Sequence, residues 1–132
     1  MKLLIGGIFS GKYERLLALG LSPDQIADGS EAAFADAFAK PALYRLNVLI
    51  RRLLAAGVDP MEFVLENAVK NPSITIACDE VGGGVVPIDR EEREYREAVG
   101  RICCKLAEKA SRVERIYCGI PTVLKAEDCD GK

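Results

Sequence analysis

The chain of 132 residues contains no histidine and no tryptophan. The lack of histidine excludes Ser-His and Cys-His nucleophilic catalysis, and it excludes any step through a phosphorylated or nucleotidylated histidine. The five cysteines include no Cys-x-x-Cys pair, so they do not form a metal-binding pattern. We expect them to be reduced and buried as small hydrophobic residues: Cys78, Cys103, Cys104, Cys118 and Cys129.

Aromatic residues are also scarce, at 6% of the chain, and the formal net charge is −2. This composition argues against a nucleic-acid-binding protein, which needs a basic surface or basic residues interleaved with aromatic ones. No apolar run approaches the length that spans a membrane, and no signal peptide is visible, so we expect a cytoplasmic protein without a membrane span. The length predicts a single domain over residues 1–132.

The first twelve residues combine a short apolar run, Leu3-Leu4-Ile5, with the glycine and lysine spacing of a phosphate-binding loop. Glycines let the backbone amides turn toward phosphate oxygens, and the lysine adds a positive charge. The helix that follows points its N-terminus at the anion. The candidate nucleotide-binding residues are those of the loop: Gly6, Gly7, Ile8, Phe9, Ser10, Gly11 and Lys12.

One position departs from this motif. Tyr13 follows the lysine, where a serine or threonine holds Mg²⁺ in loops of this kind. A phenol is too long to take that place. An ordinary glycine-rich connection between a strand and a helix therefore remains the alternative interpretation.

A second apolar run, residues 73–78, predicts a strand that is covered on both faces and ends at Asp79 and Glu80. Phosphate-loop proteins place a carboxylate near Mg²⁺ at such a strand end. We therefore predict Asp79 and Glu80 as residues that bind Mg²⁺. The alternative is a polar strand end without a function.

The segment after this strand is too rich in glycine for an ordinary connection. Close backbone approach and positive φ angles at its glycines suit a mobile substrate flap. The predicted flap residues are Gly82, Gly83, Gly84 and Pro87. A flexible linker is the alternative.

Helical patterns dominate the middle of the chain. Residues 30–71 predict helix throughout, with one helix restarting at Pro41 and another at Pro60. For residues 22–28 two interpretations remain open, a capped helix start or a turn into a brief strand.

The last third of the chain predicts one long helix and the edge of a sheet. The helix opens at Asp89, and two strands follow over residues 114–118 and 122–125, before a frayed tail at 126–132. Strands interleaved with helices indicate an α/β fold with mainly parallel pairing. We expect a three-layer domain like that of the P-loop NTPases, with a helical insertion in its middle.

Three blocks of sequence together resemble the adenosylcobinamide kinase/adenosylcobinamide-phosphate guanylyltransferase family of cobalamin biosynthesis. Residues 5–12 are similar to that family's Gly-Gly-x-x-Ser-Gly-Lys-Ser loop. Residues 80–87, Glu-Val-Gly-Gly-Gly-Val-Val-Pro, are similar to its Glu-Val-Gly-x-Gly-x-Val-Pro segment, and Arg93, Gly100 and Arg101 follow as in that family. Residues 119–125 are similar to the end of the family's chain.

The resemblance implies binding of ATP or GTP with Mg²⁺, a corrinoid substrate and a homo-oligomer. With it, Lys12 and Glu80 are predicted as catalytic residues. The departures limit it. The family binds a guanylyl group on a histidine, which this chain lacks, and Asp79 stands where the family usually carries asparagine.

Two hypotheses follow. The chain is either an adenosylcobinamide kinase without the histidine-dependent guanylyltransferase step, or a non-catalytic relative that binds nucleotide or corrinoid or acts as a structural partner. A small α/β protein with an accidental glycine loop is the third possibility.

Overall fold

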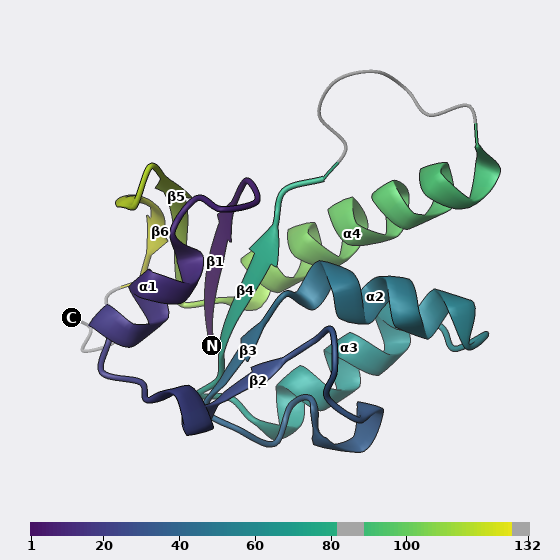
Figure 1. The fold of residues 1–132 in the computed structure, drawn as a ribbon, viewed down its shortest axis with the longest axis horizontal. Helices are drawn as coiled ribbons and strands as arrows, with labels where there is room; N and C mark the ends of the chain where they lie inside the picture. The colour runs from purple at the N-terminus through teal and green to yellow at the C-terminus, as the bar shows by residue number, and fades with distance from the viewer. Residues whose placement is uncertain (82–88, 128–132) are drawn as a thin grey trace.

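All strands of the computed structural model, which describes residues 1–81 and 89–127, form one six-stranded sheet (Figure 1). The strand order is β2-β3-β4-β1-β5-β6. Only the β5–β6 pair is antiparallel, and the other four pairs are parallel. The strand bounds are β1 Lys2–Gly6, β2 Ile26–Asp28, β3 Ala42–Tyr44, β4 Thr75–Asp79, β5 Arg112–Tyr117 and β6 Ile120–Ala126.

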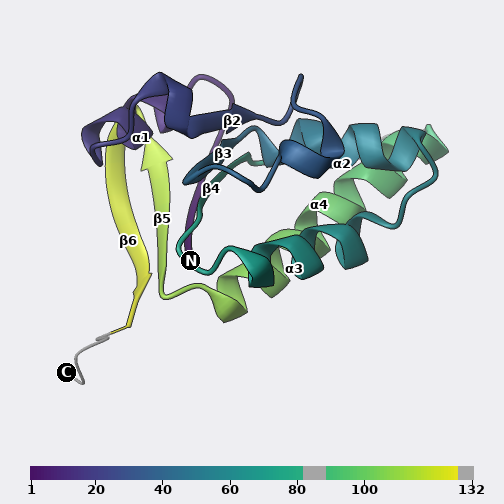
Figure 2. The same ribbon diagram turned by 90° about the horizontal axis from the view of Figure 1, so that it is seen from below.

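Helices cover both faces of the sheet, so the fold has three layers (Figures 1 and 2). Helix α1 lies on one face, and three longer helices lie on the other. Their bounds are α1 Lys12–Ala18, α2 Leu46–Ala55, α3 Pro60–Lys70 and α4 Arg90–Lys109. The predicted α/β fold with a mainly parallel sheet is confirmed.

Two apolar clusters join these layers. The larger one packs α2, α3 and α4 against the sheet, with Leu53, Ile76 and Ile102 fully buried. The smaller one lies under α1, where Leu16 contacts a cluster that includes Leu4 of β1. The apolar stripes of the helices match these two faces, because a helix buries one side at a spacing of three and four residues.

The central position of β1 fixes the geometry of the site. β1 pairs in parallel with β4 on one side and with β5 on the other. The register aligns Gly6 with Asp79, so the last residues of two neighbouring strands meet at the carboxyl edge of the sheet. In open parallel sheets this edge is where ligands bind.

The prediction of helix throughout residues 30–71 is wrong for its first part. Residues 30–41 form turns with a short 3-10 helix at Phe34–Asp36, and strand β3 follows where a helix was expected to restart at Pro41. The helix begins only at Leu46, after Arg45 in a left-handed conformation with φ 63°. The strand was missed because its three residues are too few to show a period of two. The later helix at Pro60 is confirmed, with Asp59 accepting bonds from the amides of Met61 and Glu62.

Both interpretations of residues 22–28 are partly right. A 3-10 turn at Pro23–Gln25 carries a capping box from Ser22, and it leads directly into β2. At the other end of the chain, β5 and β6 form the predicted hairpin edge. The predicted tail at 126–132 starts later than expected, since Ala126 belongs to β6 and the Glu127 amide donates to the Ser111 carbonyl; the rest of it lies outside the described residues.

The cysteines that the structure describes are less buried than predicted, and Cys129 lies outside the described residues. Cys78 is buried and Cys103 is half-buried, while Cys104 and Cys118 are exposed. Within residues 1–81 and 89–127, no helix is both long and apolar enough to cross a membrane.

Candidate nucleotide-binding site

The loop between β1 and α1 has glycine where the backbone demands it. A Cβ at Gly6 would lie 2.5 Å from the carbonyl oxygen of Ile116 and 2.6 Å from Ser10 Oγ, so no larger residue fits there. Gly11 precedes α1 with φ 102°, a conformation that side chains rarely adopt. These two positions explain the glycine spacing of the loop.

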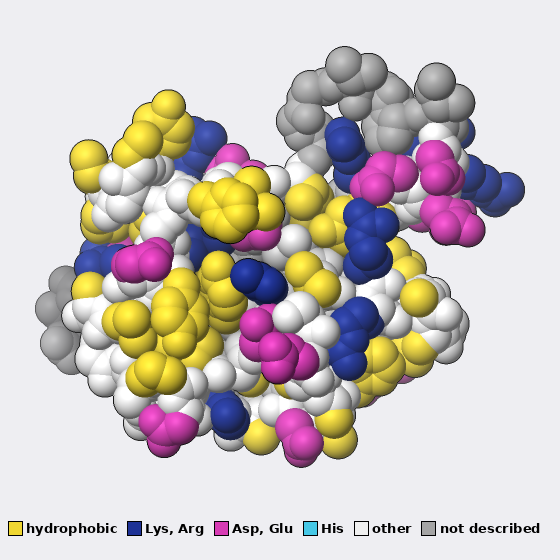
Figure 3. Space-filling model, viewed as in Figure 1, with side chains coloured by type: hydrophobic (Ala, Val, Ile, Leu, Met, Phe, Trp, Pro, Cys, Tyr) yellow, Lys and Arg dark blue, Asp and Glu magenta, His cyan; other side chains and the backbone are white. Residues whose placement is uncertain are grey.

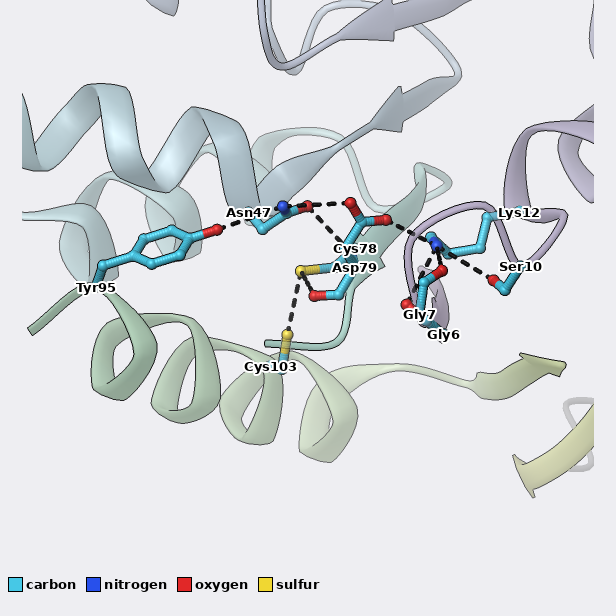
Figure 4. Close-up of polar contacts among 9 residues, drawn as sticks. All are labelled: Gly6, Gly7, Ser10, Lys12, Asn47, Cys78, Asp79, Tyr95 and Cys103. Carbon is cyan, nitrogen blue, oxygen red and sulfur yellow. Dashed lines mark hydrogen bonds and ion pairs between the residues drawn. The ribbon is translucent and has the colours of Figure 1, made fainter. Parts of the chain in front are cut away.

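Lys12 folds back into the loop instead of extending into solvent. Its side chain is 2% exposed, and its ammonium group donates to the Gly6 carbonyl at 3.1 Å and the Gly7 carbonyl at 2.6 Å (Figure 4). Ser10 Oγ lies 3.3 Å from the same nitrogen. The loop thus surrounds one cation with oxygen atoms.

Asp79 supplies the negative charge opposite this cation. Its Oδ1 atom lies 2.7 Å from Lys12 Nζ (Figure 4), and Asp79 is the last residue of β4. The structure therefore brings together Lys12 and one member of the predicted acidic pair.

The other member, Glu80, faces a different partner. Its carboxylate forms two bonds with the Arg115 guanidinium, at 2.9 and 3.1 Å, and its amide donates to the Gly6 carbonyl. Glu80 is exposed. Asp79 is the last residue of β4, whereas Glu80 follows the strand and pairs across to β5. Of the two carboxylates, Asp79 is the one at the lysine.

Asn47 is a site residue that the sequence analysis missed. It lies on α2, 6% exposed, and its side-chain oxygen accepts from the Asp79 amide at 3.0 Å. Its side-chain nitrogen lies 3.4 Å from both Asp79 Oδ2 and the Tyr95 hydroxyl (Figure 4). The available signal was a single asparagine on the apolar face of a helix, since a buried amide needs partners.

Tyr95 connects this network to α4. Burial is the largest influence on its hydroxyl, and it raises the pKa of Tyr95, so the proton stays on the oxygen near neutral pH. The Arg51 guanidinium lies 3.8 Å from the centre of the Tyr95 ring and also pairs with Glu92. Helix α2 therefore bonds Asp79 through Asn47, and α4 contacts Asn47 in turn through Tyr95.

Tyr13 has a structural role in place of the expected hydroxyl. Its ring packs against the apolar cluster under α1 and meets the Tyr44 ring edge-on, with centroids 5.2 Å apart. Large apolar contacts hold the side chain on this face of the sheet.

A depression of about 730 Å³ opens beside the loop, between Gly7 and helices α2 and α4. Besides Gly7 it is lined by Glu80, Val81, Tyr95, Arg51, Glu92 and Arg96. On the opposite side, apolar side chains gather over the β1–α1 loop and the β5–β6 turn (Figure 3), where Ile8, Phe9, Tyr117 and Ile120 are exposed. The loop therefore has a charged depression on one side and an apolar rim on the other.

The predicted flap, Gly82, Gly83, Gly84 and Pro87, lies outside the described residues. In the described part of the chain, no group of three or more cysteine or acidic side chains could hold a metal ion by itself. The donors beside Lys12 are oxygen atoms of one carboxylate and one hydroxyl, from Asp79 and Ser10. This set fits Mg²⁺, which takes one or two carboxylates and completes its shell with water and substrate phosphate.

The chain was compared with known proteins. A family model described as cobinamide kinase / cobinamide phosphate guanyltransferase matches residues 50–124, which is more than half of the chain. The matched part runs from α2 to β6 and includes Asp79 and Glu80, but it does not include the loop with Lys12. A search of curated proteins found no match.

Proposed function

The chain belongs to the cobinamide kinase / cobinamide phosphate guanyltransferase family, and we propose that it binds ATP or GTP and transfers a phosphoryl group to a hydroxyl of a corrinoid. Membership in this family indicates a nucleotide-related role in cobamide biosynthesis. The chain would not carry out the guanylyl transfer that uses a histidine, because it contains none.

The observation that carries the proposal is the buried Lys12 inside its loop, 2.7 Å from Asp79. With a triphosphate in the loop, the Lys12 ammonium would donate to phosphate oxygens instead of the carbonyl oxygens of Gly6 and Gly7. The N-terminus of α1 and the loop amides would add further donors. Phosphoryl transfer is catalysed mainly by positioning and by neutralising charge, which is what such a cradle supplies.

Asp79 would hold Mg²⁺ together with the phosphates of the nucleotide. The metal would neutralise phosphate charge when bound. Asn47 would keep the carboxylate aimed at the loop, because it bonds both the amide and the carboxylate of Asp79. Glu80, predicted as catalytic, would instead fix the strand end through Arg115.

The acceptor would approach from the depression beside Gly7. Its lining carries both signs of charge, from Arg51 and Arg96 on one hand and from Glu80 and Glu92 on the other. A hydroxyl entering there would approach Gly7, whose carbonyl is bonded by Lys12, and Glu80, which follows Asp79 at the end of β4. The apolar rim on the other side offers a surface for a large planar group, since exposed apolar patches mark binding surfaces.

A second candidate function is a non-catalytic relative that binds nucleotide or corrinoid or joins a homo-oligomer. Tyr13 favours it, because the half-buried ring packs against the apolar cluster under α1 and supplies no short hydroxyl for Mg²⁺. Binding without transfer would distinguish this candidate from the kinase.

Calorimetric titration with ATP and with GTP, each with and without Mg²⁺, tests the proposal. We expect micromolar binding that falls by at least about 100-fold in Lys12→Ala, the loss of a charge-assisted set of bonds. Lys109→Ala, which removes an exposed lysine at the end of α4, serves as the matched control and should bind normally. Transfer from the preferred nucleotide to cobinamide is then assayed.

The absence of heat with either nucleotide would overturn the phosphate-binding role of the loop. Normal binding by Lys12→Ala would do the same for Lys12. Tight binding without any transfer would leave the non-catalytic candidate.

A further inference from the structure

Two cysteines from distant parts of the chain meet directly behind the site. Cys78 is the fourth residue of β4 and Cys103 lies in the middle of α4, and their sulfur atoms are 3.6 Å apart (Figure 4). The Cys103 thiol donates to Cys78, and the Cys78 thiol donates to the Asp79 carbonyl at 3.5 Å. This arrangement links α4, β4 and the backbone carbonyl of Asp79, the residue whose carboxylate faces Lys12.

The two thiols differ in access. Cys78 is fully buried, whereas Cys103 is only partly covered. A small oxidant from solvent therefore meets Cys103 first and finds a second sulfur already in contact. Redox-active cysteines commonly pair one accessible sulfur with such a resolving partner.

We propose that Cys78 and Cys103 form a peroxide-sensitive dithiol whose oxidation to a disulfide weakens nucleotide binding. The sulfurs must approach by roughly 1.5 Å to reach disulfide length. Because Cys78 directly precedes Asp79, this approach moves the residue that faces Lys12. The regulatory half of this inference rests on the proposed function, and the formation of the disulfide does not.

The oxidation balances with a hydroperoxide, here hydrogen peroxide, as the oxidant. The Cys103 thiolate attacks one peroxide oxygen, so that an S–O bond forms, the O–O bond breaks, and the departing hydroxide takes up a proton to become water. The Cys78 sulfur, as its thiolate, then attacks the Cys103 sulfenic acid. An S–S bond forms, the S–O bond breaks, and a second water leaves. Two thiols lose two electrons and two protons, and one peroxide becomes two waters.

The first test is mass spectrometry of the intact chain and its tryptic peptides after treatment with hydrogen peroxide. We expect a loss of about 2 Da that dithiothreitol reverses, and a linked pair of peptides, residues 71–90 and 102–105. Since peptide 102–105 also contains Cys104, the assignment uses Cys104→Ser, which should still form the linked pair, and Cys103→Ser, which should not.

Two outcomes would contradict the formation of a disulfide between Cys78 and Cys103. One is a wild-type chain whose thiols oxidise to sulfinic acid without a linked peptide. The other is loss of the linked peptide in Cys104→Ser, which would assign the bond to the exposed neighbour. The Cys104→Ser result decides the matter even where Cys103→Ser fails to fold.

The second test compares nucleotide titrations of the reduced and oxidised chain. We expect the dissociation constant to rise about five- to tenfold on oxidation, within the usual range of coupling between sites, and to recover with dithiothreitol. Equal affinity in both states would overturn the regulatory role while leaving the disulfide. Failure of the reduced chain to bind nucleotide would instead overturn the proposed function.

Discussion

The Lys12 ammonium and the Asp79 carboxylate are 2.7 Å apart, and both are largely buried, with side-chain exposures of 2% and 13%. The sheet register creates this pair, because Gly6 and Asp79 end neighbouring strands. The two charges neutralise each other in this structure. A bound metal ion would take the place of Lys12 beside Asp79, and a bound phosphate would take the place of Asp79 beside Lys12. The charge of Asp79 should therefore decide how nucleotide binding depends on Mg²⁺.

We expect Asp79→Asn to abolish the gain in nucleotide affinity that Mg²⁺ provides, a change of about tenfold or more. Tyr13 supplies no short hydroxyl to share the metal, so the neutral amide would leave it without a charged protein ligand. Glu80→Gln is the matched control, because Glu80 pairs with Arg115 away from Lys12. Calorimetry with and without Mg²⁺ measures both variants. A greater loss of the Mg²⁺-dependent gain in affinity in Glu80→Gln than in Asp79→Asn would instead favour Glu80 as the metal-binding residue.

Asn47→Ala should weaken nucleotide binding although the residue does not touch the loop. The Asp79 amide would lose its acceptor in a buried place, at a cost of about 1–3 kcal/mol in the free energy of unfolding. The Asp79 carboxylate would also lose its contact with the Asn47 side-chain nitrogen, and its ion pair with Lys12 would remain. Tyr95→Phe separates the two sides of this network, since it removes only the hydroxyl and keeps the ring under Arg51. Similar losses of affinity in both variants would contradict the central place of Asn47.

Tyr13→Ser should fail to restore the usual loop chemistry, because it removes a packed ring. We expect a loss of about 2 kcal/mol in the free energy of unfolding, below the value for a fully buried ring since Tyr13 is half-buried. Tyr13→Phe keeps the contact with Tyr44 and should be as stable as the native chain. Urea unfolding of the two variants measures the difference. Native stability in Tyr13→Ser, with a large gain in Mg²⁺-dependent transfer, would contradict this expectation.

The stability of the fold should fall on acidification through Glu114. This carboxylate is 1% exposed, and bonds from the Arg15 guanidinium, then from Arg112, lower the pKa of Glu114 below its ordinary value of 4.5. A depressed pKa in the folded state means that the stabilisation is complete above pH 4.5. It disappears as the pH falls from there through the folded-state pKa.

Urea unfolding as a function of pH tests this expectation. Glu114→Gln should lose about 2 kcal/mol at pH 7, and its stability should depend less on pH below 4.5. Glu66→Gln, which alters an exposed residue of α3, should follow the native curve. A native pH dependence in Glu114→Gln would remove this residue as the cause.

The parts of the site that were predictable are local in the sequence. Gly6, Gly11 and Lys12 stand at a fixed spacing, and Asp79 follows a mostly apolar run without charged residues, so each can be recognised from its own neighbours. Their adjacency followed from a general property of parallel sheets. Asn47 could not be placed this way. Its partners lie 32 and 48 residues away in the chain, and only the packing of α2 shows them.

The errors in the fold have the same origin. Strand β3 has three residues, and its pairing with β2 and β4 decides its conformation rather than its own pattern. Likewise, Arg45 opens α2 in a left-handed conformation without a side-chain cap, so the start of that helix had no signal. The acidic pair also looked equivalent in sequence, and the direction of each side chain was needed to separate Asp79 from Glu80.

The turn between β5 and β6 packs against the loop between β1 and α1. The Gly119 amide donates to the Ser10 carbonyl at 2.7 Å, and a Cβ at Gly11 would lie 2.9 Å from Gly119 Cα. The loop is encoded within the first twelve residues, but its supporting wall comes from residues 116–119, and β1 itself needs β4 and β5 as neighbours. On the ribosome, residues 6–12 therefore emerge well before the residues that support them. We therefore expect the loop to reach its folded geometry only after residues 116–119 have emerged.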